Sequence, residues 1–379
     1  MYIDIRGIVK NEMRIRLFSI YAMSLINLPE ELINLLSLDL NELVCLALTC
    51  KDLFHLISSS KHIETSFCGI WTSKMKRWVR SIRKASFFNS QSDIVIALTD
   101  FNYPVDDQGT TGSYLHTLSL GLTPITGVSY LAKYRSLRNI FLNATLVRDI
   151  SPLADLPLQS LHINDTRVLD IEPLSKCVSL RNFSMKGTLV SDISPLSKLS
   201  LDTLDIDVSD VIDISPLENM TSLTNLSMNR TKIVDITPLA KLTGVQELLL
   251  CSVKISNVNV LQGFEGLKKL DISHTHVSDL SPLKDINLEY LDIRWTSVVD
   301  LARLSFPSLT YLNINGTKIE DISHLQCKSL RILFMMFTNI SNISMIDRFD
   351  LRYIDIRGSL VEDTSVFKKC PKLSTIFVD

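Results

Sequence analysis

The sequence feature that most constrains the fold is a repeat of 21 or 22 residues, which begins at Leu115 and continues to Asp379. Each repeat reads L-x-x-L-x-L-x-x-T-x-V-x-D-I-x-P-L, with Ile, Met or Phe at some apolar positions. Twelve recurrences at nearly constant spacing predict a solenoid, in which each unit packs against its neighbours. With the first Leu as position 1, the repeats start at Leu115, Leu137, Leu158, Leu180, Leu201, Leu223, Val245, Leu267, Leu288, Leu309, Leu330 and Leu351, and an incomplete thirteenth starts at Leu373.

The repeat that starts at Leu267 indicates how one unit folds. Leu270 and Ile272 alternate with polar residues, which is the pattern of a short strand with one buried face. One strand cannot bury that face alone, so neighbouring repeats are expected to pair in parallel around a continuous core. Proline occupies the D-I-x-P-L corner of six repeats and opposes a long helix there. The predicted fold class is an α/β repeat solenoid with a parallel concave sheet and short 3₁₀ turns outside.

Two polar positions recur with the pattern. Position 9 is Thr or Ser in every complete repeat except one, where it is Val253. A hydroxyl there can bond loop backbone groups that would otherwise be unpaired. Position 13 is Asp or Asn in eleven of twelve repeats, as in Asp149 and Asn257. A metal stripe is one interpretation, but capping of the following turn is favoured because this residue recurs with the fold.

The T-x-V-x-D-I-x-P-L ending resembles the 22-residue leucine-rich repeats of bacterial internalins and of phosphatase-regulating repeat proteins. The resemblance covers about residues 115–379. It implies a horseshoe or shallow superhelix whose concave strand face binds another protein.

Residues 24–57 form an apolar segment with a different pattern. Leu28-Pro29-Glu30-Glu31-Leu32 starts one predicted helix, and Leu38-Asp39-Leu40-Asn41-Glu42-Leu43 leads into a second. With Thr49-Cys50-Lys51 and Phe54, these residues resemble an F-box, although the first helix is about two residues shorter than usual. The resemblance implies a small all-α domain that binds a Skp-type adaptor and, through it, a cullin–RING ubiquitin ligase. The implied adaptor-binding residues are Leu28, Pro29, Leu32, Leu36, Leu43 and Leu46. The alternative is a helical cap on the repeat array.

The predicted organisation has four parts. An N-terminal extension covers residues 1–23, and the F-box covers residues 24–73. A basic linker helix and an N-terminal cap cover residues 74–114, and the repeats cover residues 115–379. Six of the eleven residues from Lys74 to Lys84 are basic. A nuclear-import or nucleic-acid patch is possible there, but the solvated face of a linking helix is favoured.

Composition argues against several classes of function. The net charge is −2, so no overall field attracts nucleic acid or an acidic membrane. No apolar run reaches the ~18–20 residues that span a bilayer, and charged residues interrupt the N-terminus where a signal peptide needs an apolar core. The seven cysteines include no C-x-x-C pair, which favours reduced thiols and a cytoplasmic or nuclear protein.

No catalytic motif stands out in the sequence, so we expect a binding protein with no cofactor and no metal rather than an enzyme. The pair His274 and His276 could bind a metal, but no Cys cluster lies near it in the sequence.

The candidate partner site lies in the later repeats. Positions 3, 5 and 7 of each strand should face the concave side, with position 8 at its rim. Early repeats place small polar residues there, whereas later repeats place large aromatic and basic residues, which are enriched at binding hot spots. The predicted substrate-binding residues are Tyr290, Arg294, Trp295, Tyr311, Phe334, Tyr353 and Arg357, with Met336 and Phe337 nearby. Asp271, Asp292 and Asp355 should add acidic points, although Phe334 and Phe337 could instead only cover the last strands.

The leading functional hypothesis is a substrate-recognition adaptor of a Skp–cullin–F-box ubiquitin ligase. The second is a repeat module, such as a phosphatase regulator, that binds proteins without any link to ubiquitin. A third, a secreted adhesion protein, is opposed by the missing signal peptide.

Overall fold

The computed structural model describes residues 63–68, 82–88, 116–301 and 304–379. The chain divides into two compact units, residues 1–146 and residues 147–379. The predicted adaptor-binding residues from Leu28 to Leu46 lie outside the described residues. Among the described residues, no helix has the length and apolar character needed to cross a bilayer.

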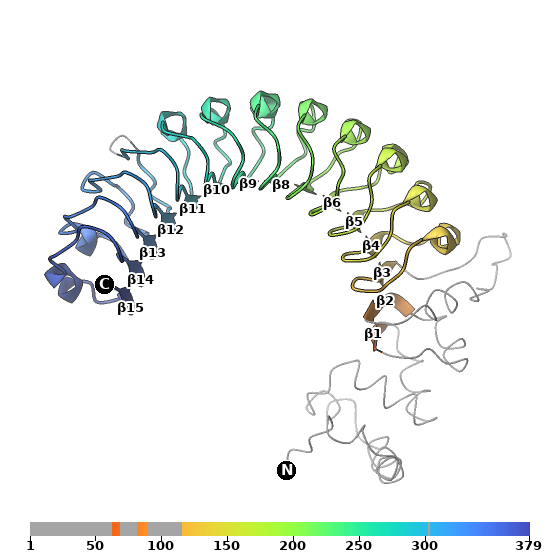
Figure 1. The fold of residues 1–379 in the computed structure, drawn as a ribbon, viewed down its shortest axis with the longest axis horizontal. Helices are drawn as coiled ribbons and strands as arrows, with labels where there is room; N and C mark the ends of the chain where they lie inside the picture. The colour runs from red at the N-terminus through yellow and green to blue at the C-terminus, as the bar shows by residue number, and fades with distance from the viewer. Residues whose placement is uncertain (1–62, 69–81, 89–115, 302–303) are drawn as a thin grey trace, which may run out of the picture. The chain divides into compact units, whose positions relative to one another are not determined.

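Residues 147–379 form a curved solenoid with one three-residue strand per repeat (Figure 1). Each strand pairs in parallel with the next, and equivalent positions of neighbouring repeats face each other, as Tyr290 faces Tyr311. The strands line the inner side of the curve, coloured from green to dark blue (Figure 1). The strands are β5 (Ser160–His162), β6 (Asn182–Ser184), β7 (Thr203–Asp205), β8 (Asn225–Ser227), β9 (Glu247–Leu249), β10 (Lys269–Asp271), β11 (Tyr290–Asp292), β12 (Tyr311–Asn313), β13 (Ile332–Phe334), β14 (Tyr353–Asp355) and β15 (Thr375–Phe377).

Short 3₁₀ turns form the outer side of this unit, as the prolines predicted. The side chain of position 13 holds the start of most turns: Asp149 Oδ1 accepts the N–H of Ser151 at 2.8 Å, and most later repeats repeat this bond. The capping interpretation of position 13 is therefore confirmed. The turns are η5 (Ser151–Leu153), η6 (Glu172–Lys176), η7 (Ser194–Leu196), η8 (Ser215–Leu217), η9 (Thr237–Lys241), η10 (Asn259–Leu261), η11 (Ser281–Leu283), η12 (Ile346–Arg348) and η13 (Ser365–Lys369).

The core lies between the strands and the outer turns. Positions 4 and 6 of each complete repeat in this unit are buried in it, and Leu226, Leu270 and Ile272 are at most 1% exposed. The hydroxyl of Thr275, at position 9, donates to the carbonyl of Ile272 at 2.7 Å, and the other Thr repeats make the same bond. Position 9 thus serves the loop backbone, as the sequence predicted. Four described cysteines are free thiols, and three of them are buried in this core.

Residues 1–146 contain two strands that the repeat pattern does not predict. The described strands of this unit are β1 (Ile63–Cys68), β2 (Ile82–Phe88), β3 (Thr117–Ser119) and β4 (Asn139–Phe141), with the 3₁₀ turn η4 (Ser129–Lys133). They pair in parallel in chain order.

The sequence analysis expected helical structure up to residue 73 and a linker helix from residue 74, so it was wrong at β1 and β2. Both segments contain β-branched and aromatic residues, which favour strands when a neighbouring strand is available for pairing.

Candidate protein-binding surface

Five aromatic side chains cross the concave face of strands β11 to β15 and contact one another in sequence. Their ring centroids are 4.1, 5.7, 4.9 and 5.6 Å apart in turn, the range in which aromatic pairs attract. Four of the side chains are half-buried, and the last is 39% exposed. We call this row the aromatic ladder; it consists of Tyr290, Tyr311, Phe334, Tyr353 and Phe377.

The ladder depends on the register of the sheet. Tyr290, Tyr311 and Tyr353 occupy position 3 of their repeats, but the repeat between the last two has Ile332 there. Phe334, at position 5 of that repeat, supplies the missing ring and contacts both tyrosines. Because parallel strands lie only about 4.8 Å apart, rings on neighbouring repeats are close enough to touch.

A second aromatic pair lies at the rim where the strands end. Trp295 and Phe337 are 50% and 58% exposed, and their ring centroids are 6.3 Å apart although a whole repeat separates them. The intervening rim residue is Gly316, which has a φ of +64°. A Cβ at Gly316 would lie 2.4 Å from a carbon of the Trp295 ring, so glycine leaves the space that this ring fills.

The two predicted arginines lie over buried carboxylates. Arg357 donates to both carboxylate oxygens of Asp355, at 3.0 and 2.7 Å, and Arg294 Nε lies 3.6 Å from Asp292 Oδ2. The arginine side chains remain 47% and 39% exposed, whereas both carboxylates are 1% exposed. The expectation that Asp292 and Asp355 offer acidic points to a partner is therefore wrong, because the guanidinium groups cover them.

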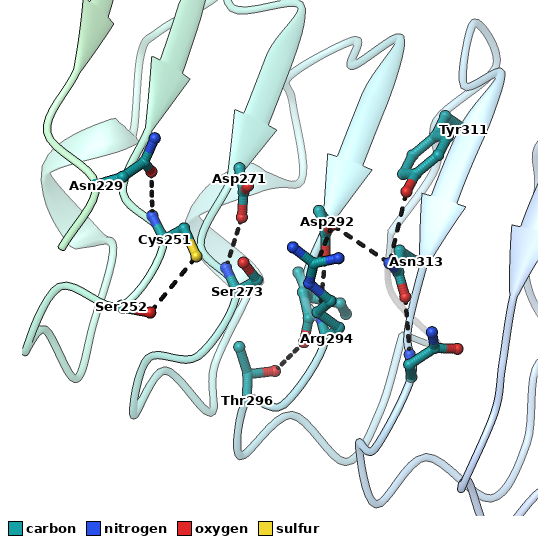
Figure 2. Close-up of polar contacts among 12 residues, drawn as sticks. Asn229, Cys251, Ser252, Asp271, Ser273, Asp292, Arg294, Thr296, Tyr311 and Asn313 are labelled. Carbon is teal, nitrogen blue, oxygen red and sulfur yellow. Dashed lines mark hydrogen bonds and ion pairs between the residues drawn. The ribbon is translucent and has the colours of Figure 1, made fainter. Parts of the chain in front are cut away.

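The buried carboxylates also satisfy the backbone. Strand pairing ends at position 5 of each repeat. The N–H of position 7 therefore needs an acceptor other than the backbone of a neighbouring strand. Figure 2 shows two solutions. Asp271 Oδ1 accepts the N–H of Ser273, two residues later in the same repeat, at 2.9 Å. Asn229 Oδ1 instead accepts the N–H of Cys251, at the same position of the next repeat, at 2.6 Å.

From the repeat at Leu180 to the repeat at Leu351, each repeat uses one of the two solutions, and none uses both. Where position 5 is Asp or Asn, that side chain accepts the position 7 N–H of its own repeat. Where position 5 is another residue, position 7 of the preceding repeat is Asn or Asp and accepts it. Most Asp and Asn side chains of the concave face are therefore structural, and the aromatic and basic residues remain as the candidates for contact with a partner.

Because either arrangement can supply an acceptor for the N–H of position 7, one should be able to replace the other. Asn229→Ala leaves the partly buried N–H of Cys251 without its acceptor and should lower the free energy of unfolding by about 1 kcal/mol. Adding Leu249→Asn restores an acceptor at position 5, in the arrangement that Asn313 and Asn315 already use at 3.1 Å. Urea unfolding should show most of the loss recovered in the double variant. A double variant as unstable as the sum of the two single changes would contradict this assignment.

Asp292 is a buried carboxyl group on this face whose surroundings change its pKa strongly. Burial, and then the negative charge of Asp271, raise the pKa of Asp292 to about 6, although the N–H and the charge of Arg294 oppose the rise. Asn313 Nδ2 joins this carboxylate to the ladder, because it lies 3.3 Å from Asp292 Oδ2 and 3.5 Å from Tyr311 Oη (Figure 2).

The raised pKa of Asp292 gives a testable pH dependence. A carboxyl whose pKa is higher in the folded state stabilises the fold at low pH, and that contribution is lost as pH rises through about 6. Two pKa units correspond to about 2–3 kcal/mol. Asp292→Asn keeps an acceptor for the N–H of Arg294 but cannot ionise. The free energy of unfolding of this variant, minus that of wild type, should therefore increase as pH rises from 4.5 to 7.5. Parallel urea titrations with equal pH slopes would contradict the expectation.

The seven predicted substrate-binding residues share one surface. Tyr290, Tyr311, Phe334 and Tyr353 belong to the ladder, Trp295 lies at the rim, and Arg294 and Arg357 lie over their carboxylates.

Sequence reasoning missed two contributors to this surface. Phe377 is the last ring of the ladder and occupies position 5 of the incomplete repeat, as Phe334 does in its own repeat. Lys269 Nζ lies 5.4 Å from the ring centroid of Tyr290, at the other end of the ladder. The register of the repeats would have identified both residues.

The histidine pair takes no part in a metal cluster among the residues that the structure describes. His274 lies at the rim, with its ring centroid 6.3 Å from that of Trp295, so it extends the exposed aromatic pair.

Comparison with known proteins identifies the fold. No protein-family model and no curated protein sequence matches the chain. Among solved structures, an internalin (InlF) from Listeria monocytogenes has a TM-score of 0.62 at 23% identity, covering 85% of this chain and 88% of that one. A leucine-rich-repeat protein from Leptospira interrogans has a TM-score of 0.72 at 15% identity, covering 87% and 86%. The plant peptide hormone receptor RGFR1, solved in complex with RGF2, has a TM-score of 0.55 at 14% identity, covering 83% and 62%. The chain thus has the leucine-rich-repeat fold.

Proposed function

We propose that this chain is a protein-binding repeat module that holds its partner on the concave face of strands β10 to β15. The observation that carries the proposal is the aromatic ladder, a row of five contacting and partly exposed rings, with the exposed rings of Trp295 and Phe337 at the rim of the same repeats. Surfaces of this kind mark interaction sites, and Tyr, Trp and Arg supply most of the binding energy at protein interfaces. The plant peptide hormone receptor RGFR1, which shares the fold, was solved in complex with RGF2. The test is loss of partner binding when the ladder tyrosines are truncated.

We further propose that residues 24–57 connect this module to a ubiquitin ligase. The support is the L-P-x-E-L start at Leu28 and the following apolar residues, which resemble an F-box. In this scheme the chain has no catalytic group of its own. The repeats hold a substrate, the F-box binds a Skp-type adaptor and thereby a cullin, and the chain contributes proximity. A module without a ubiquitin link, such as a phosphatase regulator, is the competing function.

Capture of the adaptor separates these two functions. Replacing Leu28 and Pro29 by alanine should abolish recovery of the Skp-type adaptor and the cullin from a eukaryotic lysate, because both residues belong to the proposed adaptor surface. Proteins held by the repeats should still be recovered, which controls for folding of the array. If wild type recovers neither the adaptor nor the cullin, or if the variant recovers both at full strength, the ubiquitin proposal is wrong.

A further inference from the structure

The edge of the array beside strands β13 and β14 carries four exposed cations that form no ion pair with another described residue. Where the outer turns lead back into strands β13 and β14, an open pocket of about 350 Å³ is lined by Lys328, Ser329, Arg331, Arg348, Phe349 and Asp350. Arg352 lies directly before β14. We call the four exposed cations Lys328, Arg331, Arg348 and Arg352 the basic edge.

The cations of the basic edge differ from equivalent cations in earlier repeats. Lys241 forms an ion pair with Glu218 at 2.6 Å, and Lys268 pairs with Glu289 at 3.5 Å. Within the described part of the chain, no member of the basic edge lies within ion-pair distance of a carboxylate. The acid that lines the pocket, Asp350, is bound by Lys372 at 2.6 Å. Its pKa is lowered first by that bond and then by the charges of Lys372, Arg352 and Arg331.

Two members of the basic edge directly precede strands that carry the ladder. The carbonyl of Arg331 accepts the N–H of Arg352 at 2.8 Å and the N–H of Tyr353, a ladder residue, at 3.0 Å. A ligand that covers Tyr353 and Phe334 therefore approaches the basic edge with its next residues. Such a ligand meets apolar ring edges on the concave face and unneutralised cations where the strands begin.

The arrangement of the rings decides which anionic ligand fits. Single-stranded nucleic acid binds by stacking bases on open aromatic faces beside a basic groove. Here each ladder ring contacts a neighbour, and the rings of Tyr290 and Tyr311 are only 8° from parallel at 4.1 Å, so no base fits between them. The exposed ring edges suit aliphatic and aromatic side chains of a protein.

We propose that the partner of the concave face is an acidic protein segment, with apolar side chains against the aromatic ladder and carboxylates against the basic edge. This inference rests on the proposed function and names the class of its ligand. Opposite charges at the edge speed association and set the orientation of the segment, while the ladder supplies most of the apolar contact.

The test is a selection from a random 12-residue peptide library displayed on phage, with the intact chain as bait. The enriched peptides should carry net negative charge together with Leu, Ile, Val or Phe. By fluorescence anisotropy, the best labelled peptide should bind Arg331→Glu/Arg348→Glu at least about tenfold more weakly than wild type. The matched control, Arg181→Glu/Lys241→Glu, reverses the same number of charges at the same two repeat positions far from the ladder. It should change the affinity less than about twofold. Melting temperatures establish that both variants remain folded.

Three results would overturn the inference. Enriched peptides that are neutral or basic, but that no longer bind a Tyr311→Ala variant, would show a binding face without the proposed charge preference. The proposed function would survive that result. Acidic peptides that bind both charge-reversal variants equally well would remove the role of the basic edge. A labelled 12-nucleotide oligouridylate that binds more tightly than every selected peptide, and only with the basic edge intact, would assign the edge to nucleic acid. Peptides that bind regardless of Tyr311, or no enriched peptide at all, would contradict the proposed function itself.

Discussion

Replacing Tyr290, Tyr311 and Tyr353 together by alanine is expected to weaken partner binding by at least about 100-fold. These residues supply three of the five ladder rings, and hot-spot side chains typically contribute 2 kcal/mol or more each. The loss is measured as the dissociation constant of a partner recovered with the wild-type chain. Adaptor capture through residues 24–57 should continue, because that segment is unchanged.

The early repeats offer a matched control for the ladder variant. The control residues are Asn182, Thr203 and Asn225. They occupy position 3 of the repeats that contain β6, β7 and β8, and the ladder tyrosines occupy position 3 of their own repeats. Alanine at all three should leave partner binding within about twofold of wild type, because these small polar side chains supply little contact area. Since the tyrosines are half-buried, the melting temperature of the ladder variant must also be recorded. A partner lost only from the control variant would place the site on the early repeats instead.

Truncating the core of a central repeat should produce the largest change in stability. Leu226 lies in β8 and is 1% exposed, so Leu226→Ala should lower the free energy of unfolding by about 2–5 kcal/mol through lost burial and the cavity left behind. Val234→Ala, in the same repeat, removes a side chain that is 60% exposed and should cost much less. Urea unfolding measures both changes, and equal effects would contradict the described packing.

The same array should melt at the same temperature with and without reductant or chelator. Its described cysteines are free thiols, and its strands are held by apolar burial and backbone pairing. A large fall in melting temperature on adding dithiothreitol or EDTA would show a bond or an ion that stabilises the fold.

Much of the solenoid could be predicted because its periodicity is written directly in the residues. Leu270 and Ile272 specify which face of a strand is buried, Thr275 specifies how the loop closes, and Asp279 specifies where the next turn begins. Each of these roles is local and recurs in most repeats, so one unit explains the others. Strands β1 and β2 were missed because Ile63–Cys68 and Ile82–Phe88 lack the repeat signature.

The candidate surface was predicted in composition but not in geometry. Position within the repeat was enough to place Tyr290, Tyr311 and Tyr353 in one row. It did not reveal that Arg357 folds back over Asp355, because that depends on side-chain conformation and on the cost of leaving a buried carboxylate unpaired. The roles of Asp271 and Asn229 as acceptors for backbone N–H groups could not be predicted either. They depend on where strand pairing ends, which is a property of neighbouring repeats rather than of one.

The most direct measurement of the central claim is photo-crosslinking from within the ladder. Ile332 occupies position 3 between Tyr311 and Tyr353, so benzoylphenylalanine at this position places a reactive ring on the proposed binding face. Glu218, exposed on the outer side after turn η8, provides the control position. The account predicts that the partner crosslinks from position 332 and not from position 218. A partner that crosslinks from position 218 and not from position 332 would contradict it.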